Sequence, residues 1–259
     1  MSIQESLLKW AERTVNGTEI KGIKFAGFNE ISKDTSTKYT LQSPLDQINN
    51  TIDTLVLGIN PCGAKSGSTE ISPDAFLKGN EFWKNRFNDN QVSREWATYF
   101  GRGHKMICGN QERDNLLLDN DEKTVWENLT PFVTPDSKLL ESEHWEAGLR
   151  STAELITILK PKRIILFSTE GFNLLAPYIK VEHLPIIKDM NTNKTIEIGI
   201  VDRYPAIQLS HPSRKWITHF LFLPMIVQLH KLHAVEEKNG TLDAVATKIK
   251  DQLRRIEVM

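Results

Sequence analysis

The chain has 259 residues, of which 39% are hydrophobic and 25% charged, the composition of a globular protein with a substantial core. Its net charge of −1 argues against a protein that grips nucleic acid by overall charge, so any DNA contact would need a local basic patch. Its apolar runs are too short to span a bilayer, and two cysteines are too few for a disulfide scaffold or a four-cysteine metal site.

The N-terminal part of the chain contains one predicted helix and the first predicted strand. Residues 2–14 carry apolar side chains at the spacing of an amphipathic helix and show no signal-peptide pattern, so we expect a cytoplasmic protein without a membrane partner. The next forty residues are polar and turn-rich, with a short hairpin expected near residues 20–28. Residues 54–57 form a short apolar run that stops at Gly58, which is typical of a buried strand in a parallel sheet.

The rest of the chain alternates between predicted helices and strands. We expect strands at 123–129, 163–167, 194–201 and 206–209, and helices at 142–159, 172–175, 215–237 and 242–256. This alternation favours an α/β fold, a three-layer α/β/α sandwich with a short, mainly parallel central sheet. No linker divides the chain, so we predict a single domain over residues 1–259 with a helical or irregular extension at about 1–50.

Three predicted strands end in polar residues beside a proline. The loops are Gly58-Ile59-Asn60-Pro61, Asn128-Leu129-Thr130-Pro131-Phe132 and Ser210-His211-Pro212-Ser213. Ligands of open α/β sheets bind at the carboxyl ends of strands, where a loop stiffened by proline holds a side chain in place. Singly, each loop also has a structural explanation, because Asn before Pro is common in turns and Ser213 suits a helix N-cap. Together, and in this order, they favour a functional site.

The same loops resemble the motifs of the uracil-DNA glycosylase superfamily. GINP at 58–61 is similar to the first motif of mismatch-specific uracil-DNA glycosylases, and HPS at 211–213 to the second motif of single-strand-selective and related glycosylases. NLTPF at 128–132 lies between them, where the superfamily carries an asparagine that reads the base. The chain departs from the pattern at Cys62, which precedes Gly63, in its longer segment between the motifs, and at Arg214-Lys215-Trp216 after HPS.

The resemblance implies a monofunctional DNA glycosylase that removes uracil or a related base from DNA and needs neither cofactor nor metal. Asn60 would position the attacking water, and His211 would stabilise the leaving base anion. Asn128 would pair its amide with N3–H and O4 of uracil, which the amine of cytosine would mismatch.

Further residues are expected around these three. Gly58, Ile59, Pro61, Ser210 and Ser213 would line the substrate pocket. Phe76 is the first candidate for stacking on the flipped base, ahead of Phe82 and Trp83, although aromatic residues in this segment also suit a core. Contacts to DNA phosphates are expected from Arg94, Arg102, Arg214 and Lys215 of a monomer.

Two alternatives to this glycosylase hypothesis remain open at the level of sequence. The same fold without activity would serve as a nucleic-acid or nucleotide binding module, which the near-neutral charge and the altered GINPCG loop favour. An unrelated α/β enzyme acting on small nucleotides or nucleosides would bind free nucleosides and show no salt-sensitive affinity for DNA.

Overall fold

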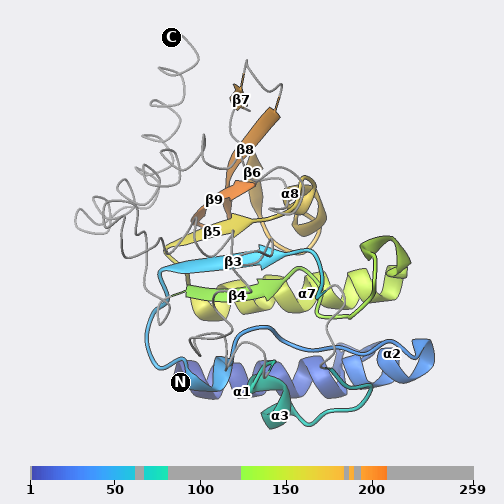
Figure 1. The fold of residues 1–259 in the computed structure, drawn as a ribbon. Helices are drawn as coiled ribbons and strands as arrows, with labels where there is room; N and C mark the ends of the chain where they lie inside the picture. Colours follow the sequence, from blue (N-terminus) through green and yellow to red (C-terminus); the bar gives the residue numbers. More distant parts are fainter. Residues whose placement is uncertain (1, 62–66, 81–123, 184–186, 190–193, 209–259) are drawn as a thin grey trace, which may run out of the picture. The chain divides into compact units, whose positions relative to one another are not determined.

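The structure is a computed structural model that describes residues 2–61, 67–80, 124–183, 187–189 and 194–208 (Figure 1). The chain divides into two compact units. Unit 1 takes its described residues from Met1–Ile52, Leu57–Asn88 and Trp126–Lys160, and unit 2 from Asp53–Val56, Asp89–Val125 and Pro161–Met259.

Helices and strands alternate along the described part of the chain. The helices are α1 (Ile3–Asn16), α2 (Phe28–Thr35), α3 (Pro73–Leu77), α7 (Ser142–Leu159) and α8 (Gly171–Leu175), with short 3-10 turns η1 (Leu45–Gln47) and η4 (Ser137–Leu139). The strands are β1 (Thr18–Ile20), β2 (Ile23–Phe25), β3 (Thr54–Gly58), β4 (Thr124–Asn128), β5 (Arg163–Leu166), β6 (Val181–His183), β7 (Ile187–Asp189), β8 (Lys194–Val201) and β9 (Tyr204–Gln208).

The central sheet confirms the predicted α/β class. Its strands follow the order β4-β3-β5-β9-β8-β6, and β7 pairs with β8. The strands β5 and β9 are parallel, with Ile165 opposite Ile207, whereas β8 runs antiparallel to β9 and to β6. The arrows of β3, β4 and β5 point the same way in Figure 1, so the sheet is mostly parallel. The strands β3, β5 and β9, near residues 55, 165 and 207, are consecutive neighbours in this sheet.

The first predicted helix is confirmed as α1, and its ends explain its length. The Ser2 hydroxyl accepts from Glu5 N at 3.2 Å, and the Glu5 carboxylate accepts from Ser2 N at 2.7 Å, which closes a capping box. At the other end Gly17 has φ +82, and a Cβ there would lie 2.7 Å from Phe25 O. Only glycine fits that turn, so the chain leaves the helix there and enters the β1–β2 hairpin.

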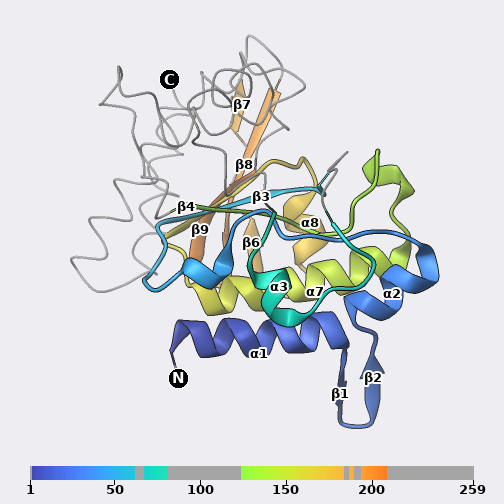
Figure 2. The same ribbon diagram turned by 60° about the horizontal axis from the view of Figure 1, so that its bottom comes forward.

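Residues 2–50 belong to unit 1. Figure 2 shows α1 alongside α7, with the β1–β2 hairpin extending beyond the helices. The indole N–H of Trp10 donates to Ser151 O of α7 at 3.0 Å, and Arg13 forms an ion pair with Glu154. The region predicted as polar and turn-rich also contains α2, whose Phe28 is buried.

Unit 2 is tied together by its loops as well as by the sheet. Gln208 at the end of β9 accepts from Phe172 N at 2.7 Å and donates to Thr169 O at 2.9 Å, which fixes the turn before α8. Before β5, Lys162 pairs with Asp53 at 3.1 Å. The two helices predicted at 215–237 and 242–256 lie outside the described residues. Among the helices that the structure describes, none is long and apolar enough to cross a membrane.

Candidate functional site

Two of the three predicted site loops lie side by side in unit 1. The segments that follow β3 and β4 stay hydrogen-bonded to each other beyond the strand ends. Leu129 N donates to Gly58 O at 2.8 Å, and Thr130 N donates to Ile59 O at 3.1 Å. The loop after β3 carries Asn60, and β4 ends on Asn128. The sequence predicted a strand before each of these polar residues, and the structure adds that the two strands are neighbours.

The amide of Asn60 joins the two loops. Its Nδ2 donates to Thr134 Oγ1 at 2.9 Å and lies 3.4 Å from the carbonyl oxygens of Phe132 and of Thr134. Its Oδ1 makes no hydrogen bond to any residue that the structure describes, and the side chain is half-buried. The nitrogen of the Asn60 amide is thus fixed by hydrogen bonds within the protein, whereas its oxygen can accept a hydrogen bond from a bound molecule.

Asn128 lies against the backbone of β3. A Cβ added to Gly58 would come within 2.5 Å of Asn128 Oδ1, so the absence of a side chain at Gly58 makes room for this amide. Asn128 Nδ2 is buried and has no hydrogen-bond partner among the described residues. An unsatisfied buried donor costs about 1–3 kcal/mol and calls for an acceptor, which a bound carbonyl oxygen would supply.

One face of α7 holds the loop after β4. Thr130 Oγ1 donates to His144 O at 3.1 Å, and Thr152 Oγ1 lies 3.2 Å from the carbonyl oxygens of Asn128 and Leu129. Between them, a Cβ on Gly148 would lie 2.4 Å from Thr130 Oγ1. His144, Gly148 and Thr152 are spaced four residues apart and therefore lie on one face of α7, and this face packs directly on the backbone of the loop after β4.

The neutral imidazole of His144 stabilises the start of α7 through two hydrogen bonds. Its Nδ1 accepts from Glu141 N at 3.0 Å, and its Nε2 lies 3.0 Å from Thr35 Oγ1, which itself donates to Ile31 O. Nε2 therefore carries the proton, because the Thr35 hydroxyl proton is already engaged. Burial lowers the pKa of this imidazole, and the neighbouring carboxylates of Glu141 and Glu143 oppose that effect.

Glu127 is a fully buried carboxyl next to Asn128. Its two oxygens accept from Gln42 N and Ser43 N, each at 3.0 Å, so it fastens the segment that covers the edge strand β4. Burial raises the pKa of Glu127 to about 8, and the two N–H donors only partly offset the cost of desolvation. The raised pKa favours the protonated form of this carboxyl.

Phe76 is a core residue and not a stacking platform. Its ring is 1% exposed and packs within 6 Å, centroid to centroid, of the rings of Trp10, Phe28 and Tyr39. A flipped base needs an accessible ring face, and Phe76 offers none, because the apolar face of α1 and the segment after α2 enclose it. This corrects the expectation that Phe76 contacts substrate. Pro61 is buried as well, whereas Ile59 is partly exposed beside Asn60.

The remaining predicted site residues lie outside the described residues, and their assignments stay predictions. They are His211, Ser210, Ser213, Arg94, Arg102, Arg214 and Lys215, together with the alternative aromatics Phe82 and Trp83 and the departure at Cys62.

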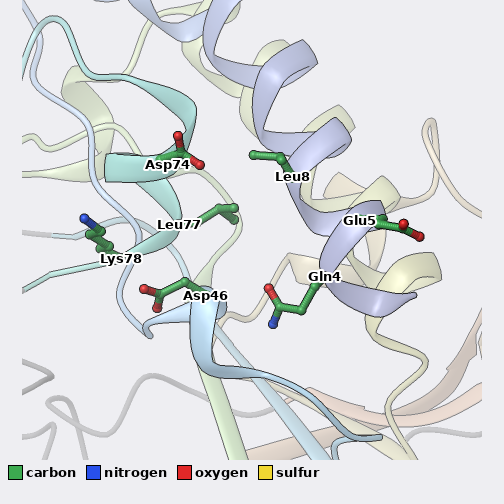
Figure 3. A pocket seen from close by; sticks show the side chains of 7 residues that line it. All are labelled: Gln4, Glu5, Leu8, Asp46, Asp74, Leu77 and Lys78. Atoms are coloured by element: carbon green, nitrogen blue, oxygen red, sulfur yellow. The ribbon is translucent and has the colours of Figure 1, made fainter. Parts of the chain in front are cut away.

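A separate hollow of about 560 Å³ lies between α1, η1 and α3. Figure 3 shows Leu8 of α1 and Leu77 of α3 pointing toward one another across it, with Asp46, Asp74 and Lys78 around them. None of its lining residues is a predicted site residue, so we do not assign it to this site.

Sequence reasoning missed several residues that shape the site. Thr134 accepts a hydrogen bond from Asn60, and Glu127, next to Asn128, accepts from Gln42 N and Ser43 N; no sequence motif marks either residue. One signal was present: His144, Gly148 and Thr152 recur at a helical spacing of four, and a glycine inside a strong helix pattern indicates a close approach.

Comparison with known proteins assigns the chain to no family, since neither a family model nor a curated protein matches its sequence. The resemblance to uracil-DNA glycosylases therefore depends on the three loops alone.

Proposed function

We propose that the protein is a monofunctional DNA glycosylase that hydrolyses the N-glycosidic bond of uracil, or of a related damaged base, in DNA. Water adds to the sugar carbon, the carbon–nitrogen bond breaks with its electron pair going to the base, and an abasic site remains. Asn60 holds the water, Asn128 recognises the base, and His211 stabilises the departing base anion.

The observation that carries the proposal is the state of the two amides at the adjacent ends of β3 and β4. Asn60 Oδ1 is left by the described residues as a free acceptor, which suits a water molecule held for attack. Asn128 Nδ2 is a buried donor without a described partner, which suits a carbonyl oxygen such as O4 of uracil. An amide is a weak base, so Asn60 orients the water rather than deprotonating it.

The topology gives further support. The strand order passes from β4 through β3 to β5, so the chain changes direction across the sheet at β3. Ligands of open α/β sheets bind at the carboxyl end of the strand where this happens. The proposal includes the finer fold description, a three-layer α/β/α sandwich of the uracil-DNA glycosylase kind.

Because the net charge of the chain is close to zero, binding to DNA requires a local cluster of basic residues. Phosphate contacts from Arg94, Arg102, Arg214 and Lys215 would make DNA affinity fall steeply with salt. After HPS, Arg214-Lys215-Trp216 offers little to fill the gap left by a flipped base, so we expect faster release from single-stranded or mismatched uracil than from paired uracil.

The test is incubation of the full chain with a single-stranded oligonucleotide that contains one uracil, followed by alkali cleavage at any abasic site. Asn60→Ala and His211→Ala should each slow release by roughly 100-fold or more, with DNA affinity unchanged, because both groups act in the transition state. Asn128→Ala should weaken binding as well as slow release. Asn173→Ala, at an exposed position of α8, is the matched control and should behave as wild type.

Three results would count against the proposal in different ways. If wild type binds DNA but releases no base from any substrate tried, the protein is a binding module. If it binds free nucleosides and no DNA, it is an α/β enzyme of another kind. If Asn60→Ala releases uracil at the wild-type rate, the loop after β3 is structural.

A further inference from the structure

The proposed role of Asn60 depends on which way its amide faces. A water held for attack needs an acceptor, so the oxygen and not the nitrogen must point toward the substrate. The two ends of an asparagine amide have nearly the same size, and packing alone does not distinguish them. Something in the protein has to select one of the two orientations by hydrogen bonding.

Three acceptors surround the nitrogen end of this amide. The carbonyl oxygens of Phe132 and Thr134 lie 3.4 Å from Asn60 Nδ2 and cannot donate. The third is Thr134 Oγ1 at 2.9 Å, and its own proton is already given to Asp136 O at 2.9 Å. A flipped amide would place Oδ1 against three oxygens with no proton to offer, so only the observed orientation is satisfied.

We propose that Thr134 is a positioning residue for the water-holding Asn60. A directed chain of hydrogen bonds runs from Asn60 Nδ2 to Thr134 Oγ1 and on to Asp136 O, and it keeps Asn60 Oδ1 facing the substrate side. Thr134 is buried and lies beyond the end of the NLTPF loop. The inference rests on the proposed glycosylase function for its catalytic consequence, whereas the link between Thr134 and Asn60 holds independently of that function.

The variant that tests it is Thr134→Val, which keeps the shape of the side chain and removes the hydroxyl. The single-turnover rate of uracil release should fall about fivefold to tenfold, the effect of one hydrogen bond, with DNA affinity unchanged. Thr134→Ser keeps the hydroxyl and should restore the wild-type rate. In the Asn60→Ala background, Thr134→Val should have no further effect, because both substitutions act through the same amide.

Thr157→Val is the matched control. The Thr157 hydroxyl also donates to a backbone carbonyl, Glu154 O at 2.8 Å, but it lies on the exposed face of α7 and bonds no asparagine. Its loss should leave the rate of release unchanged.

A second measurement does not need activity. The side-chain amide of Asn60 is the pair of NH₂ signals missing from the ¹⁵N spectrum of Asn60→Ala. In Thr134→Val this pair should shift and exchange faster with water, while Thr134→Ser and Thr157→Val should leave it in place. Thr134→Ala carries the same test if the valine variant does not fold.

The two measurements separate the two proposals. An amide signal that Thr134→Val leaves unchanged overturns the positioning role, whatever the activity of the protein. If Thr134→Val shifts the signal but the wild-type protein releases no base, the link between Thr134 and Asn60 is supported and the glycosylase function is refuted.

Discussion

The buried carboxyl of Glu127 should make the protein less stable as pH rises. An ordinary pKa of 4.5 in the unfolded chain and one of about 8 in the folded protein mean that the folded state binds the extra proton between these values. The contribution of protonated Glu127 to the free energy of unfolding is fully present below pH 4.5 and is lost as the pH rises through 8. At about 1.4 kcal/mol per pH unit, the loss is on the order of 5 kcal/mol.

Urea unfolding at several values between pH 5 and pH 8 measures this loss directly, and Glu127→Gln isolates it. Glutamine cannot ionise, but its NH₂ would face one of the two N–H groups of Gln42 and Ser43, at a cost of about 1–3 kcal/mol. The variant should therefore be less stable than wild type at pH 5, and the difference should shrink or reverse at pH 8.

The control is Glu12→Gln on the exposed side of α1, which should leave the pH dependence unchanged. Equal pH dependence in wild type and Glu127→Gln would refute the reasoning. It would mean that water or a nearby charge stabilises the ionised carboxylate of Glu127 in the folded protein.

Three further outcomes follow from the packing around Asn128 and α7. Gly58→Ala should displace the Asn128 amide in the ¹⁵N spectrum, because the new Cβ would lie 2.5 Å from Oδ1 and this side chain would have to move. Gly148→Ala should cost about 1–3 kcal/mol in urea unfolding, although alanine normally favours a helix by about 1 kcal/mol, because its Cβ would meet Thr130 at 2.4 Å. Burial lowers the pKa of His144, so its contribution to stability is present above pH 6.5 and is lost as pH falls below that value; His144→Gln should flatten this dependence in unfolding curves.

The sequence by itself determined the elements whose signals are local. The helix expected at residues 142–159 is α7 with the same ends, because its apolar residues repeat at helical spacing and Pro161 stops it. The predicted strands coincide with β3, β4, β5, β8 and β9 within one or two residues. It also indicated that Asn60 and Asn128 lie at the ends of strands, since strand ends and prolines are visible in the chain.

Tertiary structure decided what depends on contacts between distant residues. The helix α2 has eight residues, too few for a strong periodic pattern, and it forms where Phe28 enters the core of unit 1. Phe76 has the sequence context of a stacking residue, but the rings of Trp10 and Tyr39 enclose it.

The same reason explains why the polar support of the site was not predicted. Glu127 would be an ordinary charged strand residue if Gln42 and Ser43 did not bring their N–H groups to it from 85 and 84 residues away in the chain. Thr134 acquires a partner only because the loops after β3 and β4 lie side by side, 74 residues apart in sequence. A hydrogen bond forms between atoms within about 3 Å in space, and for residues this far apart in the chain only the fold determines that distance.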